Sequence, residues 1–200
     1  SQRRHVPKER FLLVASFREP KATINSTPRL WDDVIRLIAG DTELAGKTVV
    51  KCRNQAEAEA IQKKFPNVKT AYEPLPVWLE KSPAVVLGFN STSCLEAMIM
   101  GIPVAVPWWN EAFKLGEGAL LGPHTRRLHL LARSPEELGH ILREAISASG
   151  VDYRSQFSWR KNPEIREFIE ARYMPLDGKS SQRTIEALAG LIGQTEKKQK

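Results

Sequence analysis

Short runs of mostly apolar residues recur along the chain and are separated by more polar segments. Continuous apolar runs of this length, without polar alternation, are typical of strands that are buried on both faces of a sheet. We expect strands over residues 11–17, 48–53, 68–72, 84–89, 103–107 and 128–132.

Most of the segments between these runs have the spacing of amphipathic helices. Residues 28–40 carry a broad apolar stripe that begins after Pro28 and ends at Gly40. Ser134 and Pro135 form a typical helix start, and Gly101 a typical helix end. The predicted helices are 28–40, 55–64, a short turn at 77–80, 91–100, one from 135, 162–172 and 179–193.

The alternation of strand and helix predicts an α/β fold. We expect a Rossmann-like parallel sheet of about six strands with helices on both faces, followed by C-terminal helices. The 200 residues then divide into a linker over 1–10, the sheet domain over 11–150, helices that pack on it over 151–194, and a basic tail over 195–200.

The positive charge of the chain is concentrated at its ends. The formal net charge is +7, but the first ten residues carry +3 and the last six carry +2, which leaves +2 between them. A surface that binds nucleic acid is built into the folded body, so we expect no nucleic-acid partner. No apolar run is long enough to span a bilayer, and the two cysteines, Cys52 and Cys94, indicate a reducing, cytoplasmic compartment.

The histidines do not form a recognisable catalytic or metal-binding set. His124, His129 and His140 lack metal-ligand spacing, and no cluster of cysteines or carboxylates accompanies them. We therefore expect no metal and no cofactor, and we interpret His129, which lies among apolar residues, as structural. Trp108 and Trp109 follow an expected strand, and we expect at least one of them to belong to the core.

Ligands of open parallel sheets bind at the carboxyl ends of the strands, so the loops that follow the strands are the candidates. In residues 88–97 an apolar strand passes directly into a helix through small polar residues. The phosphate-binding candidates there are Asn90, Ser91, Thr92 and Ser93, together with the free N–H groups of the helix start. On the residues alone, a capping box of Ser93 and Glu96 without any ligand is an equally good interpretation.

Cations follow the first two strands. Arg18 and Lys21 come after the first strand, and Lys51 and Arg53 lie at the end of the second. Such side chains can neutralise a phosphate, although loop cations are more often solvated surface charges. Lys51 is the better candidate, because it lies in an otherwise apolar strand and a charge placed there needs a partner.

A stiff loop follows the third strand. It contains Tyr72, Glu73 and Pro74, with a second proline at position 76. The prolines leave backbone groups free to contact a nucleobase, although the same residues could form only a rigid turn.

The residues from Gly88 to Pro107 resemble a known family signature. The segment GFNSTSCLEAMIMGIPVAVP is similar to the N-S-T-x-x-L-E-A-x-x-x-G-x-P-V pattern in the C-terminal, donor-binding domain of GT-B glycosyltransferases, especially bacterial capsule and surface-polysaccharide enzymes. The segment DGKSSQR, from Asp177 to Arg183, is similar to the start of the terminal helix in those proteins. The motifs stand in the same order, and the resemblance covers residues 11–193.

The resemblance implies a domain that binds a nucleotide-sugar donor, in bacterial surface polysaccharide or glycan biosynthesis. It implies that Ser91, Thr92 and Ser93 hold the donor phosphate, that Glu96 holds the ribose hydroxyls, and that the Tyr72 loop lies by the base. Arg18, Lys51 and Arg53 occupy loops in which such enzymes place phosphate-binding cations.

A GT-B enzyme carries the acceptor site, and usually the catalytic base, on a second domain. We find no counterpart of that domain and name no catalytic residue. We therefore expect a donor-binding half that is not active alone and that meets its glycan acceptor through a missing N-terminal domain or a partner. Enzymes of this kind often work at the membrane surface. We therefore also expect that the protein attaches peripherally to the inner face of the membrane.

A hypothesis of a different class is a non-catalytic interaction module. Its basic termini would dock on an anionic membrane or on nucleic acid, and the binding would be lost when residues 1–10 and 195–200 are trimmed. A nucleotide-sugar epimerase is a weaker third hypothesis, because the expected loops lack the acidic residues and histidines that its chemistry needs.

Overall fold

The computed structural model describes residues 10–15, 27–147, 153–158 and 160–173. Several predictions concern residues outside these ranges: the linker up to residue 9, the helix over 179–193, the motif from Asp177 to Arg183, and the tail over 195–200.

A six-stranded, all-parallel sheet forms the centre of the molecule, with the strand order β3-β2-β1-β4-β5-β6. The strands are β1 (Leu12–Ala15), β2 (Thr48–Lys51), β3 (Lys69–Ala71), β4 (Val85–Gly88), β5 (Val104–Pro107) and β6 (Leu130–Ala132). The predicted α/β class and the parallel sheet are confirmed, and the described part of each strand is shorter than expected.

The second strand ends at Lys51, whereas the sequence predicted that it would end at Arg53. The cause is the start of the next helix. The side-chain oxygen of Asn54 accepts a hydrogen bond from the N–H of Glu57, and the Glu57 carboxylate accepts one from the N–H of Arg53. These caps turn the chain away from the sheet before Arg53.

Helices connect the strands. The α-helices are α1 (Pro28–Ala39), α2 (Thr42–Lys47), α3 (Gln55–Lys64), α4 (Leu75–Glu80), α5 (Thr92–Ile99), α6 (Pro135–Ile146), α7 (Tyr153–Gln156) and α8 (Pro163–Tyr173). Three 3-10 turns follow β5: η1 (Asn110–Lys114), η2 (Gly116–Gly118) and η3 (Pro123–Thr125). Ser134 caps α6 as predicted. The sequence pattern missed α2, which begins where Asp41 accepts hydrogen bonds from Glu43 and Leu44.

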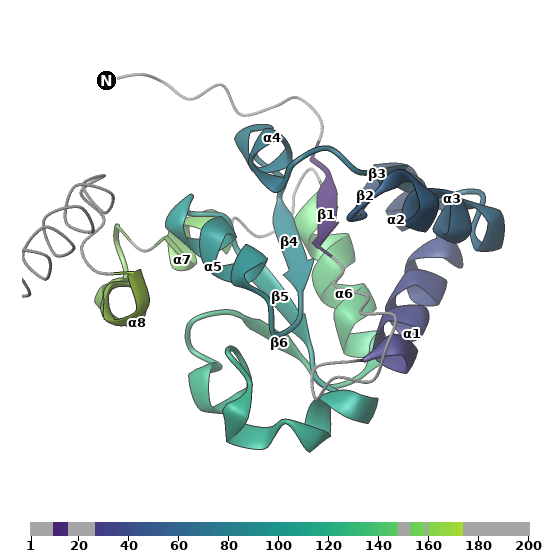
Figure 1. Cartoon of the computed structure of the whole chain (residues 1–200). Coiled ribbons are helices and arrows are strands. Elements are labelled where there is room, and N and C mark those ends of the chain that lie inside the picture. Colours follow the sequence, from purple (N-terminus) through teal and green to yellow (C-terminus); the bar gives the residue numbers. More distant parts are fainter. Residues whose placement is uncertain (1–9, 16–26, 148–152, 159, 174–200) are drawn as a thin grey trace, which may run out of the picture.

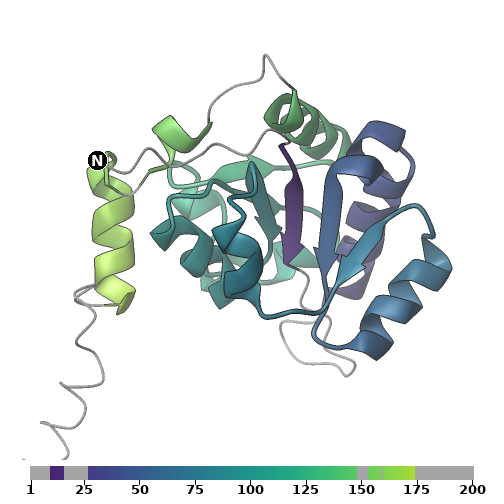
Figure 2. The same ribbon diagram turned by 90° about the horizontal axis from the view of Figure 1, so that it is seen from above.

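The helices lie in two layers around the sheet. In Figure 1, α1 and α6 lie to the right of β4 and β5 and pack on each other, and α5 lies to the left of these strands, with α8 further out. Figure 2 shows from above that α8 is the outermost helix on the α5 side. The central strands β1, β4 and β5 are buried along their whole lengths, as expected of strands covered on both faces. Trp108 and Trp109 are both buried.

Arg10, which the sequence placed in the linker, contacts the folded body. Its guanidinium donates hydrogen bonds to the carbonyl oxygens of Ala145 and Ser147, at 3.5 and 3.0 Å. These carbonyls stand at the C-terminus of α6, where a cation compensates the negative end of the helix dipole. One of the cations assigned to the N-terminal end of the chain therefore has a structural role.

Candidate functional site

The strand order places the candidate site at the carboxyl edge of the sheet, between β1 and β4. These strands are neighbours in the sheet. β2 and β3 follow on the side of β1, and β5 and β6 follow on the side of β4, so the strand order reverses between β1 and β4. Doubly wound sheets bind their ligands in the crevice beyond the carboxyl ends at such a point. Arg18 and Lys21, expected on the β1 side of this point, lie outside the described residues.

Four residues form a row along this edge. Ala15, the last residue of β1, pairs with Lys51 on one side and with Gly88 on the other, and Lys51 pairs with Ala71. Neighbouring strands are about 4.8 Å apart, so Lys51 lies roughly 10 Å from Gly88, well within the combined reach of a lysine side chain and a phosphate group.

Gly88 allows α5 to approach β4 closely. A Cβ atom at Gly88 would lie 2.5 Å from the Sγ atom of Cys94, on the first turn of α5. Burial raises the pKa of the Cys94 thiol to about 12. Cys94 therefore packs as a small, protonated side chain and is unsuited to act as a nucleophile.

Asn90 shapes the turn between β4 and α5. Its φ angle is +43°, in the left-handed region that asparagine tolerates better than most residues. Its side-chain oxygen accepts a hydrogen bond of 2.8 Å from the N–H of Leu120, 30 residues further along the chain. The predicted phosphate ligand Asn90 thus already has a structural partner.

The hydroxyl residues of the signature lie at the start of α5, as the sequence predicted. Ser91 is the N-cap, and its oxygen accepts a hydrogen bond of 3.3 Å from the N–H of Ser93. Thr92 is exposed, and Ser91 and Ser93 are half-buried. The alternative capping box of Ser93 and Glu96 is wrong, because the helix begins two residues earlier than that box requires.

The end of α5 is a glycine turn, as predicted. Gly101 has a φ angle of +69°. Its N–H donates to the carbonyl of Met98, and the N–H of Ile102 donates to the carbonyl of Ala97, both at 2.9 Å. This pair of bonds is the Schellman arrangement, which ends the helix and turns the chain into β5.

The two cations of β2 differ in their surroundings. The side chain of Lys51 is half-buried at the end of the strand, and no hydrogen-bond or ion-pair partner is found for it within the described ranges. Arg53 is exposed and stands beyond the strand end, next to the start of α3. The structure brings Lys51, and not Arg53, into the row beside the switch point.

The loop after β3 lies at the same edge of the sheet. Tyr72 is 53% exposed, and the Glu73 carboxylate accepts a hydrogen bond of 3.2 Å from the indole N–H of Trp78. The pKa of Glu73 is below its usual value, chiefly because its own backbone N–H bonds the carboxylate and then because of Trp78. Pro74 precedes α4. Two strand spacings, about 10 Å, separate β3 from β1.

Glu96 projects from the middle of α5 and is half-buried. Its backbone carbonyl accepts the N–H of Met100 in the helix. Over the part of the chain that the structure describes, its carboxylate has no assigned partner.

A segment that sequence analysis did not single out covers part of the carboxyl edge. Residues 110–120, here called the η segment, contain η1 and η2 and lie at the bottom of Figure 1. Glu111 accepts hydrogen bonds from the backbone of α1, and the Asn110 side chain donates one of 2.5 Å to Asp33. The bond from Leu120 to Asn90 fastens the other end. No local sequence signal announces these contacts, because they join residues 30 to 82 positions apart.

His129 is buried just before β6. It is 2% exposed, and neither ring nitrogen makes a hydrogen bond of good geometry to any described residue, although the Thr125 carbonyl lies near it. Burial, and secondarily the charge of His124, lowers the pKa of His129 to about 4. The side chain is therefore neutral at physiological pH, in keeping with the structural role that the sequence suggested.

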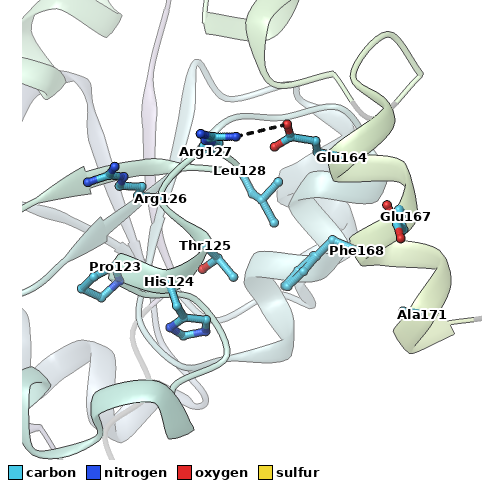
Figure 3. A pocket seen from close by; sticks show the side chains of 10 residues that line it. All are labelled: Pro123, His124, Thr125, Arg126, Arg127, Leu128, Glu164, Glu167, Phe168 and Ala171. Atoms are coloured by element: carbon cyan, nitrogen blue, oxygen red, sulfur yellow. Dashed lines mark ion pairs between the residues drawn. The ribbon is translucent and has the colours of Figure 1, made fainter.

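A groove of about 610 Å³ lies between the residues that precede β6 and helix α8. Figure 3 shows Leu128 and Phe168 turned toward each other across it, with Arg127 paired to Glu164 at 3.7 Å near one end. Its other lining residues are Pro123, His124, Thr125, Arg126, Glu167 and Ala171. None of the predicted site residues that the structure describes lines this groove, which flanks the sheet and is separate from the row at the carboxyl edge.

Two features are absent from the described residues. No helix among them is long and apolar enough to cross a membrane. In the same ranges, no three histidine, cysteine or acidic side chains converge in a way that could hold a metal ion.

The sheet order and the helix layers define the class of the protein as a Rossmann-like α/β domain with further helices after the sheet. No family model and no curated protein matches the chain. One solved structure that it resembles is described as the glycotransferase of kitacinnamycin, with a TM-score of 0.47 and 17% sequence identity. The match covers 85% of this chain and 41% of that protein, so the chain spans less than half of that protein's length. A likeness at this level says nothing about what this chain binds.

Proposed function

We propose that this chain is the donor-binding domain of a glycosyltransferase and that it binds a nucleotide-sugar at the carboxyl edge between β1 and β4. One observation carries the proposal. The segment that resembles the GT-B signature forms the unit β4, α5 and β5, and its N-S-T residues stand at the switch point of the sheet. The sequence resemblance and the topology of the sheet both support this location.

The donor phosphate would bind at the start of α5. Thr92 and Ser93 offer hydroxyl groups there, beside the N–H groups of the first helical turn. Asn90 contributes mainly by holding the turn in its left-handed conformation, because its oxygen is engaged with Leu120. We therefore assign Asn90 a positioning role within the proposed site.

Lys51 would supply the balancing positive charge. It lies in the same row as Ala15 and Gly88 and is half-buried. A half-buried charge is more favourable when an anion lies close to it, and a bound phosphate provides one. Arg18, outside the described residues, and the exposed Arg53 remain additional candidates for the same phosphate.

The nucleoside would extend from the phosphate toward β3. The exposed ring of Tyr72 can stack on a base, with Glu73 and Pro74 beside it, and the carboxylate of Glu96 can accept hydrogen bonds from ribose hydroxyls. In this arrangement, these residues would bind the nucleotide and neutralise the negative charge of its phosphate as it leaves the sugar. The acceptor glycan and the catalytic base would come from another domain or from a partner, as in the surface-polysaccharide enzymes that the sequence resembles.

A thermal-shift panel of UDP, GDP, CDP and CMP tests the proposal. A nucleotide at about 100 times its dissociation constant stabilises a protein by about 2.7 kcal/mol. We expect one nucleotide to raise the Tm by several degrees, in a concentration-dependent way. If no member of the panel changes the Tm at millimolar concentration, the proposed function is wrong.

A further inference from the structure

The N-terminus of α1 is occupied by a carboxylate from a distant part of the chain. Oε1 of Glu111 accepts a hydrogen bond of 3.2 Å from the N–H of Arg29, and Oε2 accepts one of 2.9 Å from the N–H of Leu30. In most helices the side chain of the N-cap residue takes these amides. Here the N-cap is Thr27, and its side chain makes no capping bond.

Among the residues that the structure describes, two buried polar groups in the segments that make this contact have no hydrogen-bond partner. The hydroxyl of Thr27 is buried, with the residue 3% exposed, and makes no hydrogen bond. The indole N–H of Trp109, two positions before Glu111, is also buried without an acceptor. Buried donors without acceptors cost about 1–3 kcal/mol each, so the unpaired hydroxyl of Thr27, at the N-cap of α1, points to a missing acceptor there.

The position of α1 gives the missing acceptor a chemical class. The 12-residue helix follows β1, so its N-terminus lies at the carboxyl edge beside the switch point. Helix N-termini in this position favour phosphate and other anions, because free N–H groups and the positive end of the helix dipole meet there. In this structure the Glu111 carboxylate takes that place.

We propose that the N-terminus of α1 is an anion site that Glu111 keeps closed, and that a phosphate-type anion binds there by displacing the Glu111 carboxylate. The incoming anion accepts hydrogen bonds from the N–H groups of Arg29 and Leu30 and from the hydroxyl of Thr27. The inference rests on the proposed function only for the identity of the natural anion, which is a phosphate of the nucleotide-sugar donor if that function holds.

Displacement of Glu111 releases only one anchor of the η segment. The bonds from Asn110 to Asp33 and from Leu120 to Asn90 remain. The segment therefore stays at the carboxyl edge while the anion site opens. Because the anion must compete with a carboxylate, the site favours ligands that carry more than one negative charge.

The test compares the affinity for inorganic pyrophosphate in the wild type, Glu111→Gln and Glu111→Ala, measured by titration calorimetry. The matched control is Glu117→Gln, which removes an exposed carboxylate of the same segment. We expect both Glu111 variants to bind roughly tenfold more tightly than the wild type, since the competing charge at the helix terminus is gone, and the control to be unchanged. Thr27→Val in the Glu111→Gln background should weaken binding several-fold.

A second readout locates the site. In ¹⁵N-labelled Glu111→Gln protein, pyrophosphate should shift the amide resonances of Arg29 and Leu30. Glu111→Gln keeps a side-chain oxygen that can cap α1, which preserves the fold if the alanine variant is unstable. Equal affinities in the wild type and Glu111→Gln, no binding in either, or tighter binding that leaves these two amides unshifted would each overturn the inference.

The same experiment separates this inference from the proposed function. If pyrophosphate binds Glu111→Gln as expected while no nucleotide binds either protein, the anion site stands and the donor function fails. If a nucleotide binds the wild type and Glu111→Gln equally well, the donor function stands and the closing role of Glu111 is wrong.

Discussion

The side-chain oxygen of Asn90 accepts a 2.8 Å hydrogen bond from the backbone N–H of Leu120, which joins the turn before α5 to the η segment. The φ angle of Asn90 is +43°, so the residue combines an unusual backbone conformation with a long-range contact. The first residue of the N-S-T signature therefore contributes to the shape of the carboxyl edge.

Substitutions of Asn90 should separate these two contributions. Asn90→Ala loses the hydrogen bond and also strains the backbone, and we expect it to lower the free energy of unfolding by about 2–3 kcal/mol. Asn90→Gly keeps the backbone freedom and should lose about 1 kcal/mol, while Asn90→Asp keeps an acceptor and should lose less. Urea denaturation measures all three. If Asn90→Ala and Asn90→Gly lower the free energy of unfolding equally, the left-handed conformation at this position does not affect stability.

The contact between Gly88 and Cys94 predicts a compensating pair of substitutions. Gly88→Ala places a methyl group where the Cys94 sulfur lies 2.5 Å away, and we expect a loss of about 1–3 kcal/mol from overpacking. Cys94→Ala removes that sulfur and makes room. The double variant should therefore be more stable than the sum of the two single losses predicts. Strict additivity in urea denaturation would contradict the close packing of α5 on β4.

The pKa of His129 predicts a loss of stability at mildly acidic pH. Its pKa falls from 6.5 in the unfolded chain to about 4 in the folded protein, so the unfolded chain binds more protons between these values. Stability is therefore complete above pH 6.5 and decreases as the pH falls toward 4. From pH 7.5 to pH 5 the expected loss is about 2 kcal/mol.

The variant His129→Leu tests the assignment of this pH dependence. It should flatten the dependence of the unfolding free energy between pH 7.5 and pH 5, whatever its effect on absolute stability. His140→Gln, which removes an exposed histidine, is the substitution with which the slope of His129→Leu is compared. A slope that persists in His129→Leu would assign the titration to another group.

The elements of the sheet could be predicted because each has a strong local signal. Apolar runs mark all six strands, and the start of α6 at Ser134 and the end of α5 at Gly101 follow from capping chemistry. Helix α2 was missed because it has only six residues, and its main signal is the capping residue Asp41.

The candidate site was only partly predictable. The hydroxyl residues of α5 and Lys51 could be placed at the carboxyl edge, because parallel strands all end there. The role of Glu111 could not be predicted, since it depends on a contact with Leu30 across 81 residues. The partner of Asn90 was missed for the same reason: tertiary contacts of this kind leave no local pattern.

The affinity of Lys51→Met for the best-bound nucleotide of the panel tests the central claim most directly. Methionine keeps the length and the apolar stem of the side chain but removes the charge, and Lys63→Met on the exposed face of α3 is the matched control. We expect titration calorimetry to show binding at least tenfold weaker for Lys51→Met and unchanged for Lys63→Met, because only Lys51 lies beside Ala15 at the switch point. Equal affinity of Lys51→Met and the wild type would contradict a donor phosphate bound between β1 and β4.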